Sequence, residues 1–315
     1  MAFLHDIITG DKKKPALPAK TKEEMPNAKA GISYKEWHAS HVNKHKWRNI
    51  RWAFLIFINL LFVLSFTLGF GVLEGSLSGS RLLGIYLMDP YNSLQELVIG
   101  SRAGFIPNLT TNFWIGLIVI LLFYWLLGGR AFCSWVCPYH LLAEMGEKAR
   151  NYFVKKKKIK EKIYNNTVRY VFWVVFLLLA LLTKLLVFET INPVGIFSRA
   201  IIYGPGLALL WVIALLLFEV FGIKRFWCRY VCPIGTTYSL IGDISPVGVK
   251  FDLDKCAYCR DCQDVCLVPH ELWFTQKGKA TSTIHFTGGD CTKCGLCIDV
   301  CAGQALSFDI KKLKR

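Results

Sequence analysis

The chain has 315 residues, enough for more than one folded unit, and 53% of them are hydrophobic. Its formal net charge is +16, which by itself would suit a nucleic-acid-binding protein. The basic residues, however, lie in blocks beside long apolar runs, a pattern typical of membrane topology, so nucleic acid is excluded as a partner and a membrane protein is indicated.

Residues 1–51 hold 11 Lys or Arg and 5 Asp or Glu, a balance of +6. We interpret this stretch as a cytoplasmic basic arm followed by an interfacial segment. His38, His41 and His45 would share one face of a helix there, and could be metal or haem ligands. A basic interfacial helix that leads into the membrane is the simpler interpretation.

Residues 52–242 are predicted to form a membrane domain of four helices. Each apolar run of about 20 residues, at ~1.5 Å per residue, is long enough for the ~30 Å hydrocarbon layer. The expected spans are 52–73, 109–127, 169–188 and 205–222. In the loop after the first span, Leu82 to Met88 and Leu94 to Ile99 could form short interfacial helices.

The loop between the second and third spans is basic. Residues 128–169 hold 10 Lys or Arg and 3 Asp or Glu, a balance of +7, which places this loop in the cytoplasm. Both termini are then cytoplasmic too. The few charged groups in the spans, Lys184 and Glu219, are expected to reach to the nearer interface, and Asn59 to hold helices together.

The membrane domain contains a repeat. The motif C-x3-C-P follows the second helix of each pair, with Cys133 and Cys137 in one copy and Cys228 and Cys232 in the other. Asp89-Pro90 and Asn192-Pro193 also occupy similar places in the two outer loops. A duplicated two-helix unit of this kind would bring both cysteine pairs to the cytoplasmic face.

The prolines after these motifs are expected to open new helices, because proline is tolerated in the first helical turn. Cys137 and Cys232 would then lie at helix N-termini, which favour a thiolate over a thiol. Three roles stay open for the four cysteines: a third metal or redox centre, thiol–disulfide cycling, or a structural role.

Residues 243–315 carry the spacing C-x2-C-x2-C-x3-C twice and are predicted to form an α+β ferredoxin-like domain in the cytoplasm. Three thiolates at this spacing can hold one iron–sulfur cube in a tight loop, and the fourth faces the other cube. We therefore predict two [4Fe–4S] clusters. The first is assigned to Cys256, Cys259, Cys262 and Cys301, and the second to Cys291, Cys294, Cys297 and Cys266.

The cysteine count supports metal or redox chemistry. All 12 cysteines of the chain fall in these four motifs, which argues against a secreted disulfide framework. A pair of zinc ribbons is the alternative, but zinc has no use for the triplet C-x2-C-x2-C. One departure from two-cluster ferredoxins is that Leu267 and Ala302 stand where proline usually follows the fourth cysteine.

Taken together, four spans, two C-x3-C-P motifs and two ferredoxin motifs resemble the NapH family, the membrane ferredoxin subunits of periplasmic nitrate reductase systems. NosR-like and CcoG-like proteins share parts of the pattern. The resemblance implies a multi-pass protein of the bacterial inner membrane that oxidises quinol. It also implies NapG-like iron–sulfur and NapC-like multihaem cytochrome partners, with electrons passing toward nitrate reduction.

Two functions are therefore carried forward. In the first, quinol binds in the membrane domain, with the outer loops 74–108 and 189–204 as the expected quinone site, and electrons pass to the clusters. In the second, a membrane ferredoxin supports the maturation or reactivation of a metalloenzyme cofactor. A transporter is disfavoured, because the spans offer little intramembrane polarity.

Overall fold

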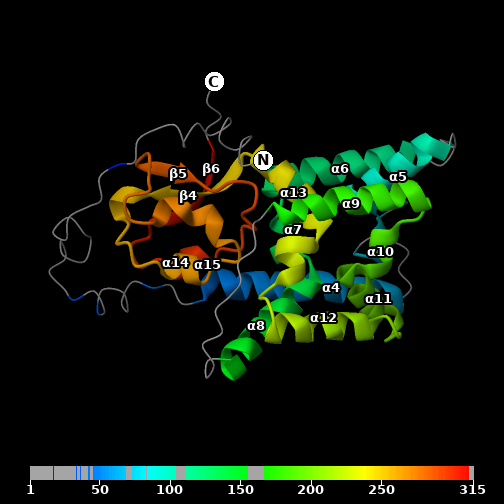
Figure 1. Cartoon of the computed structure of the whole chain (residues 1–315), viewed down its shortest axis with the longest axis horizontal. Coiled ribbons are helices and arrows are strands. Elements are labelled where there is room, and N and C mark those ends of the chain that lie inside the picture. Colours follow the sequence, from blue (N-terminus) through cyan, green and yellow to red (C-terminus); the bar gives the residue numbers. More distant parts are fainter. Residues whose placement is uncertain are drawn as a thin grey trace. The chain divides into compact units, whose positions relative to one another are not determined.

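The computed structural model describes residues 45–68, 73–77, 79–82, 84–103, 111–154 and 167–311, and the single residues 17, 33, 36 and 42. Most of the expected N-terminal arm, with His38 and His41, lies outside the described residues. The chain is mostly helical and divides into two compact units (Figure 1). One comprises Met1–Ala53, Trp125–Ala131 and Ser239–Arg315, and the other Phe54–Tyr124 and Phe132–Tyr238.

The first unit, called here the cluster unit, is built on an antiparallel sheet of order β5-β4-β6. Its strands are β4 (Val247–Asp252), β5 (Ile284–Phe286) and β6 (Leu306–Ile310). Val249 and Phe251 alternate with more exposed residues along β4, so that one sheet face is buried. In the register, Phe251 lies opposite His285 on β5 and Leu306 on β6.

Short helical turns lie beside or within the cysteine motifs of this unit: η3 (Leu253–Lys255), α14 (Asp261–Asp264), η4 (Pro269–Thr275) and α15 (Leu296–Asp299). Their apolar side chains pack on the sheet together with buried cysteines such as Cys262 and Cys297. This mixture of strands and short helices agrees with the α+β fold predicted for residues 243–315.

The second unit, called here the helical unit, contains most of the apolar helices. They are α4 (Lys46–Leu68), which begins in the cluster unit, α6 (Thr111–Leu127), α9 (Val168–Thr183) and α12 (Leu209–Phe221). Among the described residues, α4 alone is long and apolar enough to cross a bilayer; α6, α9 and α12 have 17, 16 and 13 residues. At ~1.5 Å per residue, 13 residues reach only ~20 Å.

The repeat is visible in the order of the elements. Each C-x3-C-P motif begins on a short helical segment, α7 (Ala131–Trp135) or the π-helix η2 (Trp227–Val231). A longer helix then starts at the proline, α8 (Pro138–Val154) in one copy and α13 (Pro233–Asp243) in the other. The prediction that Pro138 and Pro233 open helices is confirmed.

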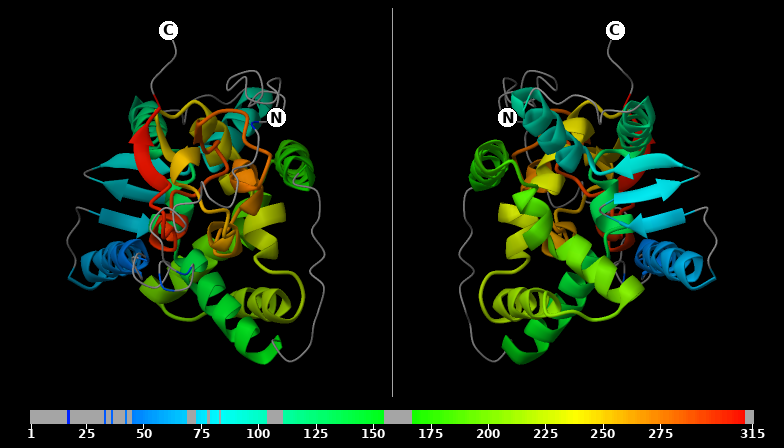
Figure 2. Two further views of the ribbon diagram at one scale, coloured as in Figure 1. Left: turned by 90° about the vertical axis from the view of Figure 1, so that its left-hand side faces the viewer. Right: turned by 90° about the vertical axis from the view of Figure 1, so that its right-hand side faces the viewer.

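The loop after α4 differs from expectation. Leu82 to Met88, expected as a short helix, belongs to an antiparallel sheet of β1 (Leu73–Ser76), β2 (Gly79–Leu82) and β3 (Ile85–Met88), which Figure 2 shows as three cyan arrows. Strand pairing therefore outweighs local helix formation in this stretch. The sheet lies close to α6, because a Cβ at Gly116 would clash with the Tyr86 carbonyl oxygen of β3. The second stretch is helical as expected, within α5 (Pro90–Ala103).

The two charged residues of the expected spans, Lys184 and Glu219, differ in their exposure. Lys184 is exposed and ends α9 in the left-handed conformation. Glu219 does not reach to an interface but is 5% exposed, and its Oε1 accepts the Trp227 N–H across 2.9 Å. It thus binds the start of η2, while Arg150 of α8 donates to the Glu219 and Val220 carbonyls at the end of α12.

Candidate metal centres

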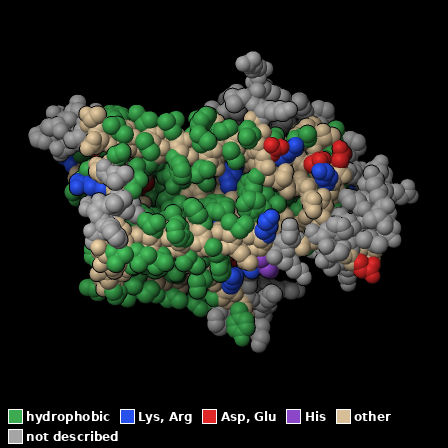
Figure 3. Space-filling view, turned by 180° about the vertical axis from the view of Figure 1, so that it is seen from behind, with side chains coloured by type: hydrophobic (Ala, Val, Ile, Leu, Met, Phe, Trp, Pro, Cys, Tyr) green, Lys and Arg blue, Asp and Glu red, His purple; other side chains and the backbone are tan. Residues whose placement is uncertain are grey.

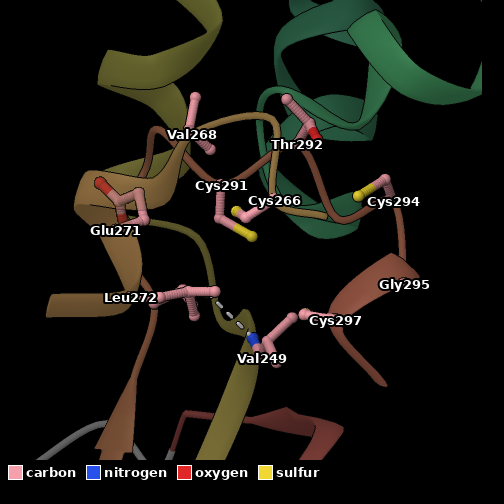
Figure 4. Close-up of a pocket in the computed structure, with 11 residues that line it drawn as sticks. Val249, Cys266, Val268, Glu271, Leu272, Cys291, Thr292, Cys294, Gly295 and Cys297 are labelled. Atoms are coloured by element: carbon pink, nitrogen blue, oxygen red, sulfur yellow. Dashed lines mark hydrogen bonds between the residues drawn. The ribbon is translucent and has the colours of Figure 1, made fainter. Parts of the chain in front are cut away.

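One pocket of the cluster unit gathers the four cysteines assigned to the second cluster. Cys266, Cys291, Cys294 and Cys297 all line a hollow with about 350 Å³ of empty space, part of it open to solvent. In Figure 4, Cys266 and Cys291 lie together and Cys294 points toward them from the opposite loop. The crossed pattern, with Cys266 contributed by the other motif, is therefore the one that the fold brings together.

The other four cysteines also share one neighbourhood. Burial raises the pKa of the Cys262 thiol to about 12, the Thr275 hydroxyl lowers it, and the negative charges of Cys259, Cys301 and Cys256 raise it further. Backbone N–H groups point at two of these sulfurs: Tyr258 donates to Cys256 Sγ across 3.4 Å and Ala305 to Cys301 Sγ across 3.2 Å. Such bonds stabilise thiolate ligands and affect cluster potentials.

The two cysteine loops have the same backbone geometry. In each triplet, the residues just before and just after the second cysteine have a positive φ: Tyr258 and Arg260 (54° and 70°), and Lys293 and Gly295 (54° and 75°). Left-handed residues at these positions curl the loop around its own sulfurs and turn N–H groups inward. Gly295 is also needed for packing, because a Cβ there would lie 2.6 Å from the Trp47 Cβ.

The cluster unit also holds a group of potential metal ligands other than cysteine. Among the described residues, the one group of three or more His, Cys, Asp or Glu whose ligand atoms all lie within 4.8 Å of one another is His270, Glu271 and Asp290. These three already make hydrogen bonds within the protein, and sequence reasoning had not singled them out.

The C-x3-C-P cysteines of both repeats lie near one another in the helical unit. Burial raises the pKa of Cys137, and the charges of Cys133 and Cys232 raise it further. Burial likewise raises the pKa of Cys228, with further contributions from the charges of Glu219, Cys137 and Cys232. The structure thus places the cysteines of the two copies in one neighbourhood.

The expected thiolate character of Cys137 is corrected by this burial. The N–H groups of His140 and Tyr139 at the start of α8 do lower its pKa, as predicted for a helix N-terminus, but burial outweighs them. A bound metal would add its positive charge to that of Arg225, which already lowers the pKa of Cys228, and would displace the thiol protons.

Sequence reasoning missed a polar cluster in the helical unit. Asp89 caps the start of helix α5, and Asn192 caps the start of α11 (Pro193–Tyr203). Both caps lie close to Glu189 of α10 (Val187–Ile191), which accepts from Asn92 across 3.0 Å and from Asn192 across 3.5 Å. The only sequence signal was the pair of Asx-Pro dipeptides.

Comparisons with known proteins agree with this chemistry. A family of 4Fe-4S binding domains matches residues 110–160 and 205–251, the two segments that contain the C-x3-C-P motifs. The ferredoxin-type protein NapH of Escherichia coli is 34% identical over 83% of this chain and 90% of that protein. NapH of Haemophilus influenzae is 33% identical over 77% of this chain and 82% of that protein. The methylamine utilization ferredoxin-type protein MauN of Paracoccus denitrificans is 32% identical over 79% of this chain and 85% of that protein. No solved structure matches the chain.

Proposed function

Since the chain belongs to the NapH family of ferredoxin-type iron–sulfur electron-transfer proteins, we propose that it is the membrane component of a quinol dehydrogenase. It takes electrons from menaquinol or ubiquinol and passes them through iron–sulfur clusters toward a periplasmic nitrate reductase. The observation that carries the proposal is the gathering of eight ferredoxin cysteines into two groups of four, one of them around a single pocket.

Two [4Fe–4S] clusters occupy these groups in the proposal. Cys256, Cys259, Cys262 and Cys301 hold the first, and Cys291, Cys294, Cys297 and Cys266 hold the second. The clusters supply one-electron transfer. The chain's own residues set their properties through burial, through N–H groups at the sulfurs and through nearby cations such as Arg51, whose charge lowers the pKa of Cys294 against the effect of burial.

The membrane assignment is supported by the surface of the helical unit. Large apolar side chains are exposed along its long helices, for example Phe57 on α4 (58%), Phe123 on α6 (55%) and Leu210 on α12 (61%). Figure 3 shows such side chains covering much of one face. Exposed apolar surface on this scale is typical of a face covered by lipid or by another protein, and the length and composition of α4 favour lipid. In the proposal α4, α6, α9 and α12 are the four spans, with both termini in the cytoplasm of a bacterial inner membrane.

The four C-x3-C-P cysteines are proposed to hold a further redox centre. Two observations favour this over a disulfide or structural role: the thiols of both repeats lie in each other's electrostatic field, and the matching 4Fe-4S binding family covers these segments. Iron and acid-labile sulfide per chain decide the matter, because about eight irons leave this site empty and about twelve fill it with a third cube.

The partners follow from the same family membership. A NapG-like iron–sulfur protein and a NapC-like multihaem cytochrome are the proposed electron acceptors.

The experiment for the function as a whole is to add menaquinol to the anaerobic protein and follow cluster reduction. Clusters that dithionite reduces and menaquinol does not would contradict it.

A second function has an observation in its favour. One of the relatives serves methylamine utilization by its name, so the same scaffold works in more than one enzyme system. A membrane ferredoxin that supports maturation or reactivation of a metalloenzyme cofactor would fit this range. A deletion strain separates the two functions: it lacks mature reductase under the maturation role, and has mature reductase without electron supply under the quinol role.

A further inference from the structure

Two helices of the helical unit begin at buried polar caps that the repeat relates to each other. Asp89 Oδ1 accepts the N–H groups of Tyr91 and Asn92, across 2.9 and 3.1 Å, at the start of α5. Asn192 Oδ1 accepts the N–H of Val194 across 3.1 Å at the start of α11. Asp89 is 5% exposed and Asn192 is fully buried. Half-helices that begin inside a membrane domain direct their positive ends at a common point.

Glu189 joins the two starts. Its Oε2 accepts from the amide of Asn92 and, at a longer distance, from that of Asn192, while Oε1 accepts from Arg199 across 3.1 Å. The side chains of Glu189 and Arg199 are 21% and 42% exposed. This group of polar side chains therefore has a buried end at Asp89 and a solvent-exposed end at Arg199.

The buried end of the cluster contains oxygens that can accept further hydrogen bonds. Asp89 Oδ2, Asn92 Oδ1 and Gln95 Oε1 are buried oxygens without a hydrogen-bond partner among the described residues. They occur at every third position over the first two turns of α5, and Asn92 and Gln95 are 3% and 0% exposed. Three unpaired acceptors in one place are costly unless a donor joins them. A group that donates hydrogen bonds, such as a hydroxyl, would satisfy these oxygens.

The same place adjoins the C-x3-C-P cysteines. Tyr91, whose hydroxyl donates to the Trp173 carbonyl across 2.8 Å, lies in the electrostatic field of both Asp89 and Cys232. Tyr238 lies in the field of both Asp89 and Cys133. The rings of Tyr91 and Tyr238 would thus lie between a hydroxyl bound at Asp89 and the C-x3-C-P cysteines.

We propose that the paired starts of α5 and α11 form the quinol site of this protein, with a quinol hydroxyl bound to the unpaired oxygens of α5 and Asp89 as its proton acceptor. The inference rests on the proposed quinol oxidation and gives that reaction a location and a base.

The chemistry balances as follows. Oxidation of quinol to quinone breaks two O–H bonds and releases two protons and two electrons. The electrons leave one at a time to the iron–sulfur centres of the cysteine motifs. Asp89 takes up the two protons one after the other and gives up each before the next; Glu189, the partly exposed carboxylate whose charge acts on Asp89, is the next acceptor on the way to the exposed end at Arg199. A carboxylate within hydrogen-bond reach of the O–H is the geometry that general base catalysis requires.

Several charged groups act on Asp89. Glu189 faces it from α10, Tyr91 from its own helix and Tyr238 from α13, while Arg199 of α11 is paired with Glu189. Burial raises the pKa of Asp89 to about 7; the Asn92 and Tyr91 N–H groups lower it and the charge of Glu189 raises it. Asp89 is therefore matched to proton exchange near neutral pH.

Asp89→Asn tests the proposal on the full-length protein in detergent, because asparagine keeps the helix cap and removes the base. Asp252→Asn is the matched control, since Asp252 caps η3 in the cluster unit with the same side-chain bond. Menaquinol-driven reduction of the clusters should slow at least tenfold in Asp89→Asn and stay unchanged in Asp252→Asn. Reduction by dithionite should be equal in all three proteins. Glu189→Gln, which removes the second carboxylate and leaves Asp89 in place, should also slow the menaquinol reaction.

The outcomes are distinct. Wild-type rates in both Asp89→Asn and Glu189→Gln would overturn the inference. Loss of dithionite-reducible clusters in either variant would assign a structural role and overturn it as well. Wild-type protein that dithionite reduces and menaquinol does not would instead contradict the proposed function.

Discussion

The backbone N–H of Trp47 donates to the carboxylate of Asp299 across 3.0 Å, and the N–H of Arg48 donates to the other oxygen of the same group across 3.1 Å. Asp299 lies between Cys297 and Cys301. The first turn of α4, the helix long enough to cross a bilayer, is therefore capped by a residue of the cysteine loop itself. The Trp47 ring also packs on Phe308 with centroids 4.8 Å apart.

Asp299→Ala should destabilise the cluster unit by about 1–2 kcal/mol, because two N–H groups at a helix start lose their acceptor. Hydrogen exchange at Trp47 and Arg48 should accelerate. Asp264→Ala is the control: Asp264 occupies the same position in the other cysteine motif but is exposed. Equal effects of the two substitutions would contradict this role of Asp299.

Arg51→Gln should make the second cluster harder to reduce. Arg51 is fully buried and its positive charge acts on Cys294. A cation near a cluster favours the more negative, reduced state, so its removal lowers the potential. The measurement is an EPR-monitored redox titration, with Arg48→Gln, one turn away and partly exposed, as control. An unchanged potential in Arg51→Gln would refute the prediction.

The crossed ligation can be tested by pairs of substitutions. Cys256→Ala with Cys301→Ala removes two ligands of one cluster and should cost about four irons per chain. Cys256→Ala with Cys266→Ala removes one ligand from each cluster and should cost up to about eight. Iron analysis and EPR provide the readout. The opposite order of losses would mean that each motif binds its own cluster.

Asp89 should also impose a pH dependence on stability. Burial raises its pKa from 3.8 to about 7, so the folded state favours the protonated carboxyl. That contribution is fully present below pH 3.8 and is lost as pH rises to about 7, roughly 4 kcal/mol in all at ~1.4 kcal/mol per pH unit. Thermal unfolding should therefore show Asp89→Asn gaining stability relative to wild type at pH 8 but not at pH 4. A gain that is the same at both values would exclude this origin.

The parts of the site that are local in sequence could be predicted. Cysteine spacing predicted two groups of four, and the cysteines of each group do lie near one another; that they bind clusters stays a prediction. Proline likewise marked the starts of α8 and α13, since its fixed φ acts within one turn. The α+β character of residues 243–315 also followed from the motif.

The parts of the structure that depend on contacts between residues far apart in the sequence could not be predicted. The run Leu82 to Met88 forms strands because of pairing across β1–β3, which composition does not reveal. Glu219 is buried because η2 offers it an N–H. The Asp89 cluster was hidden because its partners, Asn92 on α5 and Glu189 on α10, are 97 residues apart in the chain.

The most direct test is to add menaquinol to anaerobically purified protein and record low-temperature EPR spectra beside a metal analysis. The account predicts at least eight irons per chain and reduced [4Fe–4S] signals that grow with added menaquinol. Protein that carries zinc and shows no paramagnetic signal even after dithionite would contradict it.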